Sequence, residues 1–290
     1  MIPAPFDYHC PASLDEAVGL LARHGSEAKV LSGGMSLLPV LKLRLGSYAH
    51  LVDIGRIPGL DTIREENGVL TIGAMTRQAA LERSELIRTR YPILGDAIPL
   101  IADPLVRNRG TVGGNLANGD PANDQPAIML VLGATFMTRG PKGERSIAAS
   151  QFYKALYTTA LAPDEILTQI RIPIPPPRTG GAYVKLKRKT GDFAVAAAAV
   201  QVTLSTNGVI ERAGIGLTNA GPTPVEATDA AKFLVGKAPD EKTIAEAARM
   251  AAAKSEPSAD RRGSVEYKKE MARVLVGRAL HKALARAGGK

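Results

Sequence analysis

The sequence has one cysteine, no tryptophan and only 4% aromatic residues among its 290 residues. Cys10 has no second cysteine with which to form an internal disulfide. One cysteine and four scattered histidines provide too few ligands for a structural zinc site or an iron–sulfur cluster. We therefore expect no metal site in this chain, and we expect any redox metal to lie on a partner.

Long apolar runs are also absent. No stretch approaches the roughly eighteen consecutive apolar residues of a membrane helix, and the opening "MIPAPFDYHCPASLDEA" lacks the basic flank and apolar core of a secretory signal. We expect a soluble, cytoplasmic chain without a transmembrane segment. Its 45% hydrophobic content over 290 residues is enough for the cores of two ordinary domains.

Acidic residues are outnumbered, which gives a formal net charge of +9. Such an excess suits nucleic acid, an acidic partner protein or an anionic cofactor. The positive residues gather in "KLKRK" (185–189) and in the tail from Arg261 onward. The tail pattern predicts the solvated face of a helix, and the scarcity of aromatic rings leaves few platforms on which single-stranded nucleic acid could stack.

The first part of the chain mixes helical and strand patterns. "PASLDEAVGLLARHG" predicts a helix that Ser13 caps, with Glu16 three residues on and Gly25 at its end. Short apolar stretches between turn residues predict strands. The other expected elements are strands near 28–34, 50–54, 69–75 and 165–173, helical pieces around 77–89, and a helix running into a strand over 125–138.

A proline run marks the expected domain boundary. "PIPPPRTGG" follows the strand at 165–173, and beyond it two strands joined by Asn207-Gly208 predict a hairpin, with helices to the end of the chain. We expect an α+β protein with a first domain at 1–177, divided into subdomains at about 1–56 and 57–177. The second domain, at 178–290, should combine an antiparallel sheet with helices.

Two adjacent glycine pairs carry the functional signal. "LSGGMSLLP" (31–39) and "GTVGGNLAN" (110–118) each place two glycines at an expected turn beside a strand. Glycine tolerates positive φ and has no Cβ, so successive N–H groups can point into one concavity that suits phosphate. Either loop alone is more often a tight structural turn, but the matched pair suggests one pyrophosphate held from both sides. The flanking side chains that could add hydrogen bonds are Ser32, Ser36, Thr111 and Asn115.

Other nucleotide and catalytic motifs are missing. GxxxxGK[ST] and a GxGxxG between strand and helix do not occur, which argues against a P-loop ATPase and a Rossmann site. No nucleophile elbow and no HExxH occur either, so we assign no catalytic residue and no metal ligand. An organic redox cofactor would itself supply the chemistry.

Four segments carry a family resemblance: "AKVLSGGMSLLPVLKLRL", "HLVDIGRIPGL", "DPLVRNRGTVGGNLANGDPANDQPAIMLVLGAT" and "YVKLKRKTGDFAVAAAAV". Their order and spacing resemble the FAD-binding medium subunit of the molybdenum hydroxylases, the group of carbon monoxide dehydrogenase, xanthine dehydrogenase and hydroxybenzoyl-CoA reductase. The resemblance runs through nearly the whole chain. It implies a two-subdomain FAD-binding domain of the vanillyl-alcohol-oxidase/PCMH-like type, with the FAD pyrophosphate between the two glycine loops.

The resemblance also implies individual FAD-contacting positions. Asp124 matches a contacting aspartate, Leu167 and Lys187 match two further contacts, and Phe193 stands where relatives have a large residue, often tyrosine, near the isoalloxazine. The residues themselves leave other roles open: Asp124 as a helix cap, Leu167 as strand core and Lys187 as a solvated charge. The implied loop contacts are Val30, Leu31, Ser32, Gly33, Gly34, Met35, Ser36 and Leu37 in the first loop, and Thr111, Val112, Gly113, Gly114 and Asn115 in the second.

As a hypothesis, the chain is an electron-transfer subunit. The resemblance implies a large partner with a molybdenum cofactor and a small partner with two-iron two-sulfur clusters, assembled as a dimer of heterotrimers. FAD on this chain would pass electrons to an external acceptor. Two alternatives remain at this point: a free-standing flavin-dependent oxidase, and a basic nucleic-acid-binding protein motivated by the charge.

Overall fold

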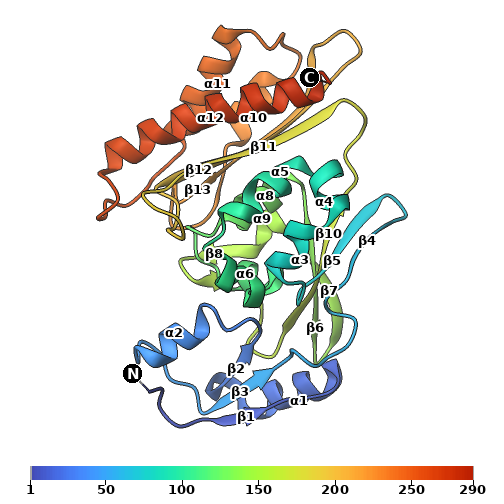
Figure 1. Ribbon diagram of the computed structural model, residues 1–290, viewed down its shortest axis with the longest axis vertical. Coiled ribbons are helices and arrows are strands. Elements are labelled where there is room, and N and C mark those ends of the chain that lie inside the picture. Colours follow the sequence, from blue (N-terminus) through green and yellow to red (C-terminus); the bar gives the residue numbers. More distant parts are fainter. Residues whose placement is uncertain (1, 290) are drawn as a thin grey trace.

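The computed structural model describes residues 2–289. Figure 1 shows the three larger sheets following one another along the long axis, from the N-terminal end (blue) to the C-terminal helices (red). With 38% of the residues in helices and 27% in strands, the expected α+β class is confirmed. Across residues 2–289, no helix is both long and apolar enough to cross a membrane.

The N-terminal sheet is small and parallel. Its strand order is β1-β3-β2, and the first helix packs against it over a core that includes Val18, Leu21 and Val52. Helix α1 begins as expected, because the Ser13 hydroxyl accepts a hydrogen bond from the N–H of Glu16, and it ends at Gly25 with φ 55°. The elements are β1 (Asp7–His9), α1 (Leu14–His24), η1 (Gly25–Glu27), β2 (Ala28–Leu31), α2 (Leu37–Lys42) and β3 (His50–Asp53).

The middle sheet is antiparallel, with strand order β4-β5-β10-β6-β7. Its strands are β4 (Ile63–Glu66), β5 (Val69–Gly73), β6 (Thr135–Gly140), β7 (Gly143–Ala148) and β10 (Ile166–Pro173), and a small hairpin joins β8 (Tyr153–Ala155) to β9 (Thr158–Thr159). Short helices, in place of the two expected pieces, fill the interval between β5 and β6. They are α3 (Gln78–Arg83), α4 (Glu85–Arg90), α5 (Pro92–Ala97), η2 (Ile98–Leu100), α6 (Pro104–Arg109), α7 (Val112–Ala117) and α8 (Asp124–Val131), and α9 (Ala149–Phe152) follows β7.

The C-terminal sheet has strand order β11-β12-β13-β14, which adds two strands to the hairpin expected around Asn207-Gly208. Figure 1 shows α11 and α12 covering the face away from the middle sheet, while α5 and α8 lie on its other side. The elements are β11 (Thr179–Leu186), β12 (Ala196–Leu204), β13 (Ile210–Thr218), β14 (Val225–Glu226), α10 (Thr228–Leu234), α11 (Glu241–Ala253) and α12 (Val265–Ala287).

Alternate alanines of β12 enter different cores. Ala197 and Ala199 belong to the core of the middle region, whereas Ala196 and Ala198 belong to the core beneath α11 and α12. Because successive strand residues point to opposite faces, a run of small side chains lets helices pack closely on both sides. This strand therefore connects the C-terminal sheet to the region that holds the second glycine loop.

A buried carboxylate clamps three strands of the middle sheet. Glu165, just before β10, accepts two hydrogen bonds of 2.6 Å from Arg145 of β7 and one from the Thr138 hydroxyl of β6. Burial alone would raise the pKa of Glu165, but these donors outweigh it and lower the pKa to about 2.

This clamp predicts an acid transition. Because the folded-state pKa is depressed, the stabilisation is present above the ordinary glutamate pKa of about 4.3 and is lost as the pH falls through about 2. Denaturant unfolding of wild type and Glu165→Gln over that range should show a steeper loss of stability in the wild type. Equal pH dependence would mean that the clamp does not control acid stability.

Candidate cofactor-binding site

The first glycine loop follows β2 directly. Val30 and Leu31 are the last residues of this strand, residues 32–36 form the turn, and Leu37 opens α2. Gly34 has φ 77°, a conformation that side chains other than glycine rarely adopt. Among the hydrogen bonds within residues 2–289, none uses the backbone N–H groups of Gly33, Gly34, Met35 and Ser36. These four donors are therefore available to a ligand.

The second glycine pair lies in a helix, which corrects the expected turn. Thr111 is the N-cap of α7, and Gly113 and Gly114 stand in the first turn. The N–H groups of Val112 and Gly113 donate to the carbonyls of Thr76 and Ala74, and the N–H of Gly114 donates to the Thr111 hydroxyl. The first two of these donors thus fix the segment against the connection between β5 and α3.

The two glycine segments meet directly. The hydroxyls of Ser32 and Thr111 lie 2.6 Å apart. A Cβ on Gly33 would overlap the Arg109 carbonyl oxygen and lie 2.9 Å from the Gly110 Cα, so only glycine permits this approach of the two backbones. The predicted pairing of segments about eighty residues apart is present, and the first loop faces a rigid helix start.

Asn115 carries an unpaired polar atom at this junction. Its side-chain oxygen is buried without a hydrogen-bond partner, while its backbone carbonyl accepts a bond of 2.8 Å from the Asn123 side chain. A buried carbonyl oxygen without a donor costs free energy, and a bound ligand can supply that donor. The hydroxyls of a ribose or ribityl chain are suitable donors, so the residues present fit a flavin dinucleotide.

Two arginines, Arg77 and Arg109, lie at the junction of the glycine segments. The Arg77 guanidinium donates to the Arg109 backbone carbonyl, and burial together with the positive charge of Arg109 lowers the pKa of Arg77. Two guanidinium groups close together favour an anion such as a pyrophosphate. Arg107, by contrast, is committed to an ion pair with Glu82 at 2.8 Å, in agreement with a structural role.

Asp124 opens α8 and is nearly fully buried. Its two carboxylate oxygens accept hydrogen bonds of 2.6 Å from the Tyr183 hydroxyl and 2.8 Å from the Lys185 ammonium, both on β11. Burial raises the pKa of Asp124, against the opposing effects of Lys185 and Tyr183. The N-cap of α8 is Asn123, so the alternative of Asp124 as the cap is wrong.

Leu167 is buried in β10 beside an irregularity of the strand pairing. The carbonyl of the next residue, Thr168, accepts a bond from the Ala74 N–H, and the Ala74 carbonyl accepts one from Gly113. These two hydrogen bonds connect the strand that carries Leu167 to the second glycine pair through Ala74. Lys187 directly follows β11, and its positive charge is among the effects that oppose the burial-induced rise in the pKa of Asp124.

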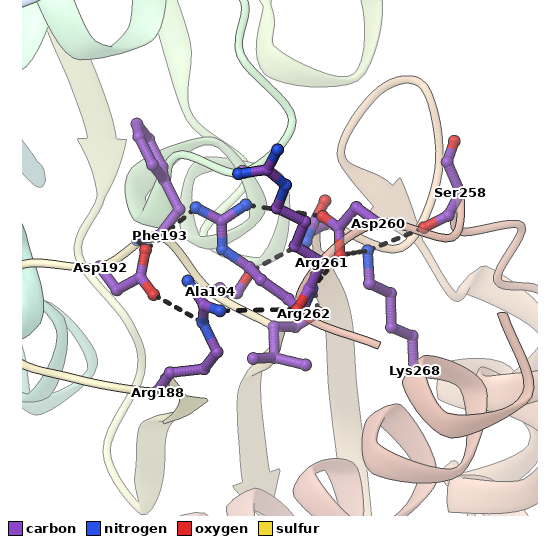
Figure 2. Close-up of polar contacts among 12 residues, drawn as sticks. Arg188, Asp192, Phe193, Ala194, Ser258, Asp260, Arg261, Arg262 and Lys268 are labelled. Carbon is purple, nitrogen blue, oxygen red and sulfur yellow. Dashed lines mark hydrogen bonds and ion pairs between the residues drawn. The ribbon is translucent and has the colours of Figure 1, made fainter. Parts of the chain in front are cut away.

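Phe193 lies on the connection between β11 and β12 and is 45% exposed. Asp192 holds this connection by ion pairs to Arg188 at 3.2 Å and to Arg262 at 3.0 Å. Figure 2 shows the Phe193 ring extending away from the Asp192 carboxylate, which Arg262 reaches from the segment before α12. The ring is thus presented outward from a charged anchor.

Several residues that support the site were not anticipated. Gln78 and Gln125 form a buried reciprocal amide pair, and the Gln78 side chain also donates to the Thr111 carbonyl. The sequence shows Lys185 as one charge of a basic segment, yet its side chain is only 1% exposed. The available signal was strand alternation, because Tyr183 and Lys185 are two residues apart and share a face.

Comparison with known proteins agrees with this geometry. Residues 4–175 match the family "FAD binding domain in molybdopterin dehydrogenase", and residues 181–283 match "CO dehydrogenase flavoprotein C-terminal domain". The chain is 50% identical to the carbon monoxide dehydrogenase medium chain of Afipia carboxidovorans over 99% of both chains. It is 46% identical to that of Hydrogenophaga pseudoflava, again over 99% of both.

Solved structures agree as well. A chain in the crystal structure of the cyanide-inactivated Cu,Mo-CO dehydrogenase matches with a TM-score of 0.96 and 49% identity, over 99% of this chain and 100% of that chain. Fold and loop junction together define a flavoprotein subunit of the PCMH-like type. The chain belongs to the FAD-binding medium-subunit family of the molybdenum hydroxylases, and the expected family is confirmed.

Proposed function

We propose that this chain binds one FAD at the junction of its two glycine segments and transfers electrons within a molybdenum hydroxylase complex. When bound, the isoalloxazine accepts and releases electrons. The observation that carries the proposal is the combination of four available N–H donors in the first loop with the unpaired side-chain oxygen of Asn115.

The two glycine segments contribute differently to FAD binding. The first loop, Gly33 to Ser36, supplies backbone donors to the pyrophosphate, and the nearby arginines supply positive charge. The second segment fixes the first loop in place and offers Asn115 to a hydroxyl of the cofactor. Leu167, Lys187 and Phe193 are proposed as further FAD contacts. Asp124 is proposed as another, from its buried position beside Lys185.

We further propose that FAD lies in a domain of residues 1–177, with subdomains at about 1–56 and 57–177, and that 178–290 form the second domain. The separate sheets and the change of family model between residues 175 and 181 support this division. The small iron–sulfur partner would dock near the cofactor, and the large molybdenum partner near the basic C-terminal region. We propose a dimer of such heterotrimers in the cytoplasm.

Reconstitution tests the binding step. The purified full chain, titrated with FAD, should bind about one equivalent noncovalently and quench flavin fluorescence. Because the unpaired side-chain oxygen of Asn115 is assigned to the cofactor, Asn115→Ala should bind FAD more weakly than wild type. The variant should keep the elution volume and circular dichroism spectrum of the wild type. If folded chain retains no flavin at any concentration tested, alone or coexpressed with its partners, the proposal is wrong.

Coexpression of the three subunits tests the electron-transfer role. The expected outcome is a single size-exclusion peak containing this chain, with flavin, iron and molybdenum. If this chain elutes alone and a small-molecule substrate reduces its flavin without any metal subunit, the free-standing oxidase is the correct alternative. Salt-sensitive DNA or RNA binding without flavin binding would instead favour the nucleic-acid alternative.

A further inference from the structure

Three of the four histidines come together in the N-terminal sheet. His9 ends β1, His24 ends α1 and His50 begins β3, so the fold collects them from three elements. The expectation that the histidines are scattered is therefore wrong. The nitrogen atoms that could serve as ligands all lie within 4.8 Å of one another, and the three side chains are half-buried.

The separations suit one small ion. The Nε2 of His9 lies 3.2 Å from the Nδ1 of His50. In a tetrahedral site with Zn–N distances of about 2.0 Å, two ligand nitrogens are about 3.3 Å apart. This pair already has that spacing, and the widest separation in the cluster needs to shorten by at most about 1.5 Å.

Ring positions show which side chain must move. The His9 ring centroid lies 5.5 Å from that of His24 and 5.3 Å from that of His50. Centroids of imidazoles on one tetrahedral ion lie roughly 5 Å apart. Only His24 and His50 are closer, at 3.7 Å, so rotation of the His24 ring, at the end of α1, opens the space for the ion.

A carboxylate stands beside the same nitrogen. Asp7 Oδ2 lies 3.5 Å from His50 Nδ1, and Asp7 pairs with His50 in the register of β1 and β3. Its side chain is 76% exposed and free to turn toward the ion or toward a water bound to it. Imidazole and carboxylate are ligands that Zn²⁺ takes in tetrahedral sites.

The histidines are separate from the cofactor site. His50 pairs with Ala28 at the beginning of β2, whereas the first glycine loop leaves the opposite end of that strand, after Leu31. We propose that His9, His24 and His50 bind one divalent ion of the zinc class, with Asp7 or water in the fourth position. The ion fastens β1 and α1 to β3.

Zinc titration of the tag-free full chain, stripped with a chelator, tests this site. Isothermal titration should give about one Zn²⁺ per chain with a Kd in the micromolar range or below, and zinc should raise the melting temperature. His24→Gln and His50→Gln should each weaken zinc binding at least tenfold. His281→Gln is the matched control, since His281 lies on α12 beside Glu241 and is half exposed.

The outcomes separate this site from the flavin site. FAD binding should be the same in His24→Gln as in wild type, so loss of zinc binding alone would support the proposal. Substitution with Co²⁺ should give the visible absorption of a four-coordinate ion in wild type and not in the variants. If folded wild type takes up no stoichiometric zinc, or if His24→Gln binds it as tightly as wild type, the histidines form a stacked, hydrogen-bonded cluster only and the proposal is overturned.

Discussion

Replacing Lys185 by methionine should destabilise the protein by about 3–5 kcal/mol, since removing one partner of a buried ion pair leaves an uncompensated charge. The side chains of Lys185 and Asp124 are 1% and 6% exposed, and their charged atoms lie 2.8 Å apart. Methionine keeps the side chain as far as the ε carbon, with sulfur in place of the δ methylene, and removes the ammonium. The Asp124 carboxylate then keeps the Tyr183 hydroxyl as a donor and loses its counter-charge.

A surface pair of the same length provides the control. Lys282 lies 2.8 Å from Asp96, but its side chain is 44% exposed. Exposed ion pairs contribute about 0–1 kcal/mol, so Lys282→Met should change the free energy of unfolding far less than Lys185→Met. Urea unfolding of both variants, together with Asp124→Asn and the double variant, measures the coupling between Lys185 and Asp124.

The pH dependence of unfolding provides a second test of the Lys185→Met prediction. Without Lys185, burial raises the pKa of Asp124 further, and a raised folded-state pKa means stability that is present at low pH and lost as the pH rises. The difference in free energy of unfolding between wild type and Lys185→Met should therefore be smaller near pH 4 than near pH 7. Equal destabilisation by the Lys185 and Lys282 variants would show that the buried pair is not ionised.

The sequence predicted those helix ends and turns that depend on neighbouring residues alone. The Ser13 cap, the end of α1 at Gly25 and the hairpin at Asn207-Gly208 each depend on residues within a few positions. Local patterns do not predict the strand β11. Its first half directly follows the proline run, and its end overlaps the charged segment "KLKRK". In the structure, all eight residues of β11 pair with β12, and Gly180 to Tyr183 are buried in succession, so no alternating pattern marks this strand.

The site required information that local patterns do not contain. Two glycines in succession disfavour a helix, yet Gly113 and Gly114 lie in the first turn of α7. The Gly113 N–H donates to the Ala74 carbonyl, and a Cβ on Gly113 would lie 2.8 Å from that oxygen. Tertiary contact thus decides the conformation there. The matched glycine pairs predicted that the two loops act together, and family resemblance supplied the individual contact positions, whereas the histidine cluster depends on three elements that only the fold brings together.

Replacing Gly114 by valine should reduce FAD affinity at least tenfold, which corresponds to about 1.4 kcal/mol. Gly114 is not among the glycines with positive φ, so the expected effect is steric. A Cβ at this position would lie 2.7 Å from the Thr111 hydroxyl oxygen and 3.5 Å from that of Ser32. The two further methyl groups of valine would separate Ser32 from Thr111 and displace the first loop, whose N–H groups we assign to the pyrophosphate.

Gly19→Val is the matched control for this substitution. Gly19 is an exposed helical glycine of α1, and a Cβ there meets no atom within 4 Å. Fluorescence titration with FAD should separate the two variants, while circular dichroism and melting temperature establish that both are folded. Because the contact between Ser32 and Thr111 joins the two glycine segments, folded Gly114→Val with wild-type affinity would show that the first loop binds FAD without support from the second.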